Sequence, residues 1–180
     1  MKKKKKTKKE QTILKNKEIV YSIACVLLMI DQLIKLLVRS NVPLLKEINV
    51  IGDFFSIYHI ENTGAAFSLF SGSTVVLIII SVLVLLFLHY YVLSEASITK
   101  WRMFGLGIVI GGIVGNLVDR ILYGAVVDYL SFNFFGYGFP VFNIADIGIT
   151  LGFIILAIGI LRRDSNEFLE TSRDKRREEN

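Results

Sequence analysis

Two aspartates in the second half of the chain stand among apolar residues, where their carboxyl groups are suited to acid–base chemistry. Asp128 ends the segment Gly-Ala-Val-Val-Asp, and Asp146 ends the segment Phe-Asn-Ile-Ala-Asp. If the two carboxyl groups meet in a partly apolar pocket, ionising both is unfavourable, so one keeps a proton while the other stays charged. Aspartic proteases activate water and protonate the scissile amide with such a pair. A helix-capping role is the alternative for either residue, since Asp favours helix starts.

A second polar set follows the spacing of a helix face. Gly112, Asn116, Asp119 and Arg120 are related by steps of three and four residues, which places an amide, a carboxylate and a guanidinium together. Charged groups are unfavourable in lipid, so this face must turn inward. Two interpretations stay open for Arg120: it extends to the membrane interface as an ordinary helix-end residue, or it pairs with a carboxylate inside the bundle.

Asp31 and Lys35 form a third polar set, four residues apart within an apolar segment. This spacing places both side chains on one side of a helix, where they can pair with each other or with neighbouring helices. We favour a structural or substrate-positioning role for them over direct catalysis. Asn143 precedes Asp146 by three residues, so those two also share a helix face.

The segments around these polar residues are too apolar for a typical soluble protein. Hydrophobic residues make up 53% of the 180 residues, and the mean hydropathy is +0.55. Four apolar stretches each approach the ~20 residues that a spanning helix needs. The sequence therefore predicts an all-α integral membrane protein whose four transmembrane helices lie at residues 18–39, 74–93, 102–121 and 143–162.

The distribution of basic residues orients these predicted spans. Lysines crowd residues 1–17, and basic residues return in the loop at 94–101 and the charged tail at 163–180, all on the same side. The positive-inside rule makes that side cytoplasmic, so both termini are predicted to be cytoplasmic. Loops 40–73 and 122–142 then face the other side, which we expect to be the working face.

Local motifs predict further details of the outer loops and the third span. Residues 54–60 are aromatic and β-branched, which suits a short strand or hairpin on the membrane surface. Gly-Tyr-Gly at 136–138 is interpreted as a turn, because phenylalanines stand where a potassium-filter motif needs Thr-Val. Gly111 and Gly115 have the spacing that lets membrane helices approach closely, so the third span is predicted to be central. The single cysteine, Cys25, excludes a disulfide framework.

Five segments taken together resemble the lipoprotein signal peptidase family, also called signal peptidase II, a group of bacterial intramembrane aspartic proteases. The resemblance spans almost the whole core but not the lysine-rich start or the charged tail. It implies a four-transmembrane-helix bundle with a small β-sheet on the extracytoplasmic side. The segments that carry it are DQLIK at 31–35, NTGAAF at 62–67, GGIVGNLVDR at 111–120, GAVVD at 124–128 and FNIAD at 142–146.

The same resemblance implies the site and the substrate. Asp128 and Asp146 would be a catalytic dyad that cuts the signal peptide from a prolipoprotein just before its diacylglyceryl-modified cysteine, without a metal or other cofactor. The expected partners are such prolipoproteins and membrane lipids, and we expect a monomer in the bacterial cytoplasmic (inner) membrane. The residues implied to line or support the site are Asn62, Gly64, Asn116, Arg120, Asn143, Asp31, Lys35, Gly112 and Asp119.

Other classes of protein fit the sequence less well. A proton-coupled transporter also uses intramembrane acids, but the second apolar stretch has none, so no polar route crosses the membrane. Proteases of the prepilin or presenilin type carry a Gly-x-Gly-Asp motif, which is absent from this sequence. A non-enzymatic assembly factor leaves the buried charges unexplained. Beside a membrane span, the lysine run sets topology and attracts anionic head groups, so no nucleic-acid partner is expected.

Overall fold

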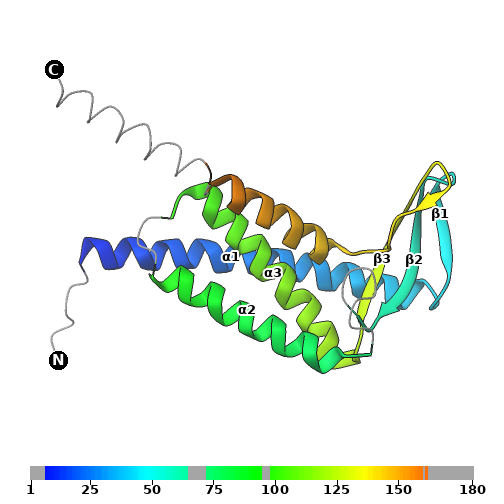
Figure 1. The fold of residues 1–180 in the computed structure, drawn as a ribbon, viewed down its shortest axis with the longest axis horizontal. Coiled ribbons are helices and arrows are strands. Elements are labelled where there is room, and N and C mark those ends of the chain that lie inside the picture. Colours follow the sequence, from blue (N-terminus) through cyan, green and yellow to red (C-terminus); the bar gives the residue numbers. More distant parts are fainter. Residues whose placement is uncertain (1–6, 65–71, 95–97, 160, 162–180) are drawn as a thin grey trace, which may run out of the picture.

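The helices run side by side and the strands gather at one end of them (Figure 1). The computed structural model describes residues 7–64, 72–94, 98–159 and 161. The predicted helix-rich architecture is confirmed, while the predicted tail at 163–180 lies outside the described residues. Within those residues, three helices are long and apolar enough to cross a membrane, and a shorter apolar helix follows: α1 (Lys8–Asn41), α2 (Thr74–Ser94), α3 (Lys100–Tyr123) and the last helix, Ile144–Gly159.

Helix α1 begins ten residues before the first predicted span, because a capping box starts it early. The Thr7 hydroxyl accepts a hydrogen bond from Glu10 N at 3.3 Å, and the Glu10 carboxylate accepts one from Thr7 N at 2.7 Å. This reciprocal pair satisfies two backbone donors that a helix start otherwise leaves open. The basic segment from residue 8 onward is therefore continuous with the spanning helix.

Helix α3 lies at the centre of the bundle, because its glycines allow close approach on two sides. A Cβ atom at Gly111 would lie 2.6 Å from the Ala24 carbonyl oxygen of α1, and one at Gly112 would lie 2.5 Å from the Ala145 carbonyl oxygen of the last helix. α3 ends at Gly124, whose φ of 76° is in the left-handed region that favours glycine. The predicted central position of the third span is confirmed.

A small antiparallel sheet stands where α1 and α3 end. The strand predicted near residues 54–60 is present as β2 (Phe55–Asn62). A loop was predicted where β3 (Val126–Phe134) lies, although the alternation of apolar and polar residues in VVDYLSFNF is typical of a strand. β3 pairs with β2 so that Asp128 lies opposite Ile60. The strands follow the order β1 (Glu47–Ile51), β2 (Phe55–Asn62), β3 (Val126–Phe134) and β4 (Tyr137–Gly138).

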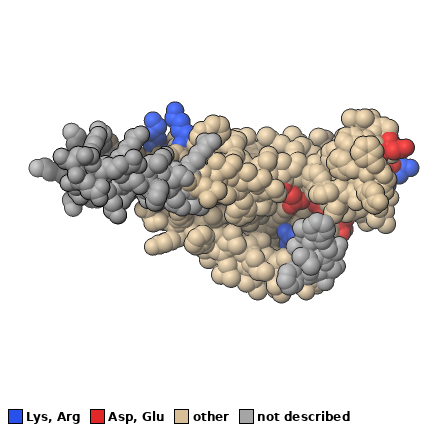
Figure 2. Space-filling model, turned by 45° about the horizontal axis from the view of Figure 1, so that its top comes forward, with Lys and Arg blue, Asp and Glu red and all other residues tan. Residues whose placement is uncertain are grey.

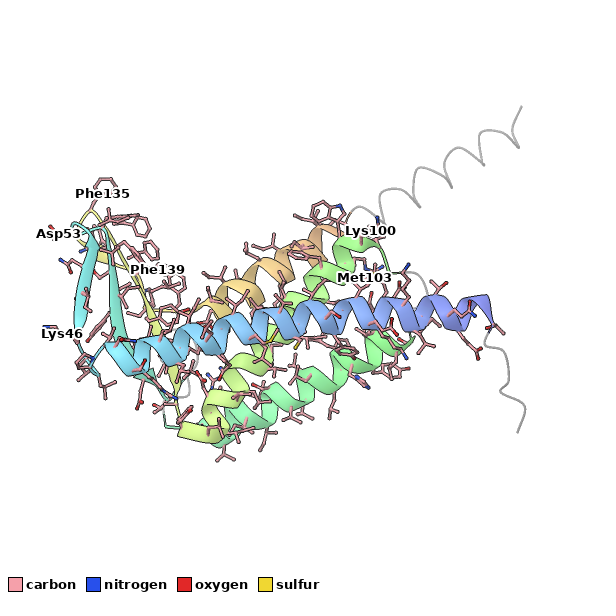
Figure 3. All side chains as sticks on the ribbon, turned by 180° about the vertical axis from the view of Figure 1, so that it is seen from behind. Lys46, Asp53, Lys100, Met103, Phe135 and Phe139 are labelled. Atoms are coloured by element: carbon pink, nitrogen blue, oxygen red, sulfur yellow. The ribbon has the colours of Figure 1, made fainter. Side chains whose placement is uncertain are left out.

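One side of the sheet carries packed aromatic rings. Phe132 stacks on Phe142 with ring centroids 5.8 Å apart, and Phe139 meets Phe142 edge-on at 5.7 Å. Figure 3 shows Phe139 on the side that faces along the helices, whereas Lys46 and Asp53 lie on the far side. The sheet thus has an apolar side turned towards the flank of the bundle and a charged side turned away.

Candidate active site

Asp128 lies in β3 with 2% of its surface exposed, and both carboxylate oxygens accept hydrogen bonds from side-chain amides. Asn143 Nδ2 donates to Oδ1 at 2.7 Å, and Asn62 Nδ2 donates to Oδ2 at 2.9 Å. The Asn62 amide is oriented in turn, because its Oδ1 accepts from Gly64 N at 2.9 Å. The donors that hold Asp128 are therefore neutral amides.

Asp146 lies in the first turn of the last helix and completes the cap of that helix. Its Oδ2 accepts from Asn143 N at 3.2 Å, while Asn143 Oδ1 accepts from Asp146 N at 3.0 Å. Its Oδ1 accepts from Asn116 Nδ2 of α3 at 2.8 Å. Asp146 thus takes part in the cap through one carboxylate oxygen, but the residue that precedes the helix is Asn143, and the other oxygen of Asp146 faces α3. The positive end of the helix dipole favours the ionised carboxylate at this position.

Asn143 connects the two aspartates. The residue is fully buried, and its backbone and side-chain oxygen complete the cap with Asp146. Its Nδ2 lies 2.7 Å from Asp128 Oδ1, 3.2 Å from Asn116 Oδ1 and 3.3 Å from Val127 O. An amide group has two hydrogens for these three acceptors, and the shortest contact is to Asp128. A single asparagine therefore holds both carboxyl groups.

Lys35 is the centre of a buried charge cluster that adjoins the two aspartates. Its Nζ lies 2.9 Å from Asp31 Oδ2, 3.0 Å from Asp119 Oδ2 and 2.9 Å from Asn116 Oδ1. The three ammonium hydrogens thus have three acceptors, which a buried lysine requires. The predicted pairing of Asp31 with Lys35 is confirmed. Through Asn116, the ammonium group is one side chain away from Asp146.

The carboxylates of this cluster also hold the backbone on either side of the dyad. Asp31 Oδ1 accepts from Ala145 N at 3.1 Å, at the start of the last helix. Asp119 Oδ2 accepts from Val127 N at 3.2 Å, in the residue before Asp128. Two acids from α1 and α3 therefore fix the position of the two elements that carry the dyad.

Arg120 links α3 to the end of β2. Its guanidinium donates to the Gly64 carbonyl oxygen at 2.8 Å and to the Asn116 carbonyl oxygen at 3.4 Å. Its Nε is buried and has no partner in the described part of the chain. These two hydrogen bonds go to backbone carbonyls, and the nearby negative charges are those of Asp146, Asp128 and Asp119, so both interpretations of Arg120 stay open. The side chain holds Gly64 close to the two aspartates, and its Nε stays without a partner among the described residues.

The remaining predicted residue, Gly112, lies in the same region. Gly112 contacts the last helix, as described above, and a Cβ atom at Gly115 would lie 2.5 Å from Asp31 Oδ2. Figure 2 shows acidic and basic side chains together on a largely uncharged face, near the junction of helices and sheet. The structure thus brings all the predicted site residues into one connected network.

The electrostatic environment distinguishes Asp128 from ordinary aspartates. Burial raises the pKa of its carboxyl group to about 7, and the negative charge of Asp146 contributes to the rise. The amides of Asn62 and Asn143 act in the opposite direction, because they stabilise the ionised form. At neutral pH, Asp128 therefore holds a proton in a substantial fraction of molecules.

The part of the chain that carries this network matches the sequence model of one known protein family. The sequence model of the signal peptidase (SPase) II family matches residues 23–162, which include Asp31, Asp128 and Asp146. The chain belongs to the signal peptidase II family. Membership makes it a protease, and the resemblance first seen in five short segments is confirmed.

Individual proteins are also similar to this chain, in sequence and in structure. The lipoprotein signal peptidases of Staphylococcus aureus strains JH9 and Newman are each 34% identical over 145 residues, which cover 81% of this chain and 89% of theirs. Two solved structures, both of a bacterial membrane enzyme determined by the in meso method, are 33% identical. The first aligns with a TM-score of 0.76 over 82% of this chain and 90% of that structure's chain. The second aligns with a TM-score of 0.71 over 79% of this chain and 92% of that structure's chain.

Two residues of this polar network were missing from the predicted set. Gln32 Nε2 donates to Asp119 Oδ1 at 3.0 Å, so it supports the charge cluster. The Tyr129 hydroxyl accepts from Ile144 N at 3.4 Å, next to the cap of the last helix. An amide within an apolar span was a usable sequence signal for Gln32. No sequence signal pointed to Tyr129, because aromatic residues are common in strands.

Proposed function

We propose that this protein is an aspartic endopeptidase that removes signal peptides from prolipoproteins by cutting just before the diacylglyceryl-modified cysteine. The observation that carries the proposal is the pair of contacts that Asn143 makes, one to each of Asp128 and Asp146. The contacts hold two carboxyl groups, from separate elements, on either side of one asparagine. That arrangement is suited to a dyad that shares one proton.

In the proposed reaction, a water molecule attacks the scissile carbonyl carbon and gives a proton to ionised Asp146. Asp128 donates its proton to the carbonyl oxygen, so a neutral gem-diol forms. The gem-diol then returns a hydroxyl proton to Asp128, while Asp146 gives its proton to the leaving nitrogen as the carbon–nitrogen bond breaks. The products leave the dyad in its starting protonation state, as general acid–base catalysis requires.

We assign the shared proton to Asp128 because the two carboxyl groups have different surroundings. Asp146 accepts from backbone N–H at a helix start and from Asn116, whose own oxygen accepts from the Lys35 ammonium. Both features favour a negative charge. Asp128 is deeply buried, and its hydrogen-bond donors in the described part of the chain are neutral amides, which supports a carboxylic acid there.

Asn62, Gly64 and Arg120 are proposed to contact the substrate backbone beside the dyad. Asn62 and Gly64 lie at the end of β2, and Arg120 fixes Gly64 through its carbonyl oxygen. The Arg120 Nε, which has no partner within the described ranges, is a donor that a substrate carbonyl oxygen would satisfy. Gly112, Asp31, Lys35 and Asp119 are proposed to support the site without contacting the substrate.

We further propose that the chain acts as a monomer in the bacterial inner membrane, with Ile144–Gly159 as the core of a fourth span. Both termini are then cytoplasmic, as the basic segments favour. The sheet and the dyad then lie towards the outer face, where the phenylalanine side of the sheet is apolar enough to contact lipid. A single chain supplies both aspartates and their hydrogen-bond partners.

The test is cleavage of lipid-modified prolipoprotein by the purified protein in vesicles. Asp128→Asn and Asp146→Asn are each expected to reduce the rate by about 10³-fold or more, since each removes a proton-transfer group. Asp53→Asn is the matched control, because Asp53 is exposed on the far side of the sheet. Full activity in either dyad variant would overturn the proposed mechanism. Equal cleavage of substrate without the diacylglyceryl group would overturn the proposed specificity.

A further inference from the structure

A groove opens between α1, α2 and α3, away from the residues that hold the dyad. Its volume is about 580 Å³, within the range of pockets that hold small ligands. Apolar side chains form most of its wall, among them Leu28, Leu85 and Val114. Cys25, the single cysteine of the chain, also lines the groove and is exposed. The groove lies between helices that are apolar enough to span a membrane, so the medium outside it is lipid.

Two polar side chains stand in the same wall. The Tyr21 hydroxyl lies 2.7 Å from His89 Nδ1, so the two groups form one hydrogen bond. Tyr21 lies ten residues before Asp31 on α1, or about 15 Å along the helix axis, on the side remote from the dyad. On the proposed orientation, the pair therefore lies in the cytoplasmic half of the membrane.

His89 needs a further polar partner at this position. Its side chain is exposed, and its other ring nitrogen has no partner in the described segments of the chain. A polar group that faces hydrocarbon without a hydrogen bond is unfavourable by several kcal/mol. The ester and phosphate oxygens of a phospholipid are the acceptors that a membrane itself supplies near its interface.

A cation lies at the same end of the groove. Lys17 precedes Tyr21 by four residues, so it is on the same side of α1 and one turn nearer to the cytoplasmic end. A lysine at this depth attracts the phosphate of a lipid head group. Towards the middle of the membrane, the wall continues through Cys25 and Leu28 without further charge.

We infer that this groove is a binding site for one inner-leaflet phospholipid, with an acyl chain against Leu28, Leu85 and Val114. The head-group oxygens then contact the Tyr21–His89 pair, and Lys17 contacts the phosphate. The site goes beyond the proposed peptidase activity. It uses none of the residues assigned to the dyad or its supports, so its occupancy and the cleavage reaction are separable.

Cys25 provides a direct test, because a bound acyl chain would cover its thiol. The full chain, delipidated in detergent, is labelled with monobromobimane in the presence and absence of phosphatidylglycerol. The expected result is labelling at least fivefold slower with the lipid in the wild type. His89→Leu combined with Tyr21→Phe is expected to remove that protection, with prolipoprotein cleavage retained.

A cysteine outside the groove distinguishes binding in the groove from nonspecific coverage of the protein surface by lipid. In Cys25→Ser with Leu83→Cys, the thiol lies on an exposed part of α2 that does not line the groove, and the same lipid is expected to change its labelling less than twofold. Equal rates for Cys25 with and without lipid would overturn the inference. So would protection of Cys25 by a synthetic signal peptide and not by phosphatidylglycerol, since the groove would then hold a peptide.

Discussion

Asn143 donates from its side-chain amide to Asp128 at 2.7 Å, so the capping residue of a helix holds a carboxyl group that belongs to a β-strand. Because of this contact, we expect cleavage to depend more strongly on Asn143 than on any other residue of the site that does not ionise. Asn143→Ala removes it together with the cap, which alone contributes about 0.5–2 kcal/mol. We expect cleavage to fall by about 10²-fold or more.

The control for this variant is Asn133→Ala, because the Asn133 side chain also makes a hydrogen bond, its Oδ1 accepting from Gly136 N at 2.9 Å in the outer turn of the sheet. Prolipoprotein cleavage and thermal unfolding in detergent are measured on both proteins. If the Asn143 variant cleaves as fast as the Asn133 variant, the asparagine does not position the dyad.

The titration of Asp128 predicts how activity depends on pH. The proposed reaction needs a proton on Asp128, whose pKa is raised to about 7, so kcat/KM is expected to fall as pH rises above 7, about tenfold per unit. Because the native carboxyl binds its proton more tightly than the unfolded one, stability also falls as pH rises from about 4 to 7.

Asn62 supplies the internal check on this pH profile. Its amide stabilises the ionised form of Asp128, so Asn62→Ala should move the alkaline limb of the profile to higher pH. An alkaline limb that stays at the same pH in this variant would contradict the assignment of the proton to Asp128.

Removal of the buried ammonium group should destabilise the whole bundle. Lys35→Met leaves the carboxylates of Asp31 and Asp119 without their cation, and breaking a buried ion pair in this way costs about 3–5 kcal/mol. Thermal unfolding in detergent measures the effect. Lys46→Met, at an exposed position on the outer sheet, is the control and should change stability by less than about 0.5 kcal/mol. Equal melting temperatures for the two variants would refute the structural role of the cluster.

The contact between α3 and the last helix leaves no room for a side chain at Gly112. In Gly112→Ala, the new Cβ atom would lie 2.5 Å from the Ala145 carbonyl oxygen, which must move. Overpacking of this kind destabilises by about 1–3 kcal/mol and should also displace Asp146, so both unfolding temperature and cleavage should decrease. Gly138→Ala meets open space and should leave both quantities unchanged. A fully active, stable Gly112 variant would show that the interface is looser than described.

Because one side of the sheet is aromatic and the other is charged, we expect the turn at Phe135 to lie deeper in the membrane than the turn at Asp53. Spin labels are placed in a Cys25→Ser background at Phe135→Cys or at Asp53→Cys. Phe135 is fully exposed and Asp53 lies on the charged side of the sheet. In vesicles, the label at 135 should be accessible to oxygen and shielded from a water-soluble nickel reagent, with the reverse at 53. Equal accessibility would place the sheet away from the bilayer.

The sequence by itself determined the apolar helices, the central position of α3 and the identity of the polar residues at the site. These features depend on local chemistry: length and hydropathy decide which segments can span a membrane, and glycine spacing decides which helix faces can approach. The segments that carry Asp128 and Asp146 were recognisable for the same reason, since acids in apolar surroundings require a function.

Only the tertiary structure decided how the two aspartates differ. Asp128 lies in a strand, where a loop was predicted, because strand pairing depends on β2, which is more than sixty residues away in sequence. Arg120 donates to the carbonyl oxygen of Gly64, two residues after the end of β2, a contact between segments far apart in sequence. The link from Lys35 through Asn116 to Asp146 joins three helices. Hydrogen bonds between distant segments leave no periodic pattern in the sequence. The different environments of the Asp128 and Asp146 carboxyl groups therefore arise only when the chain folds.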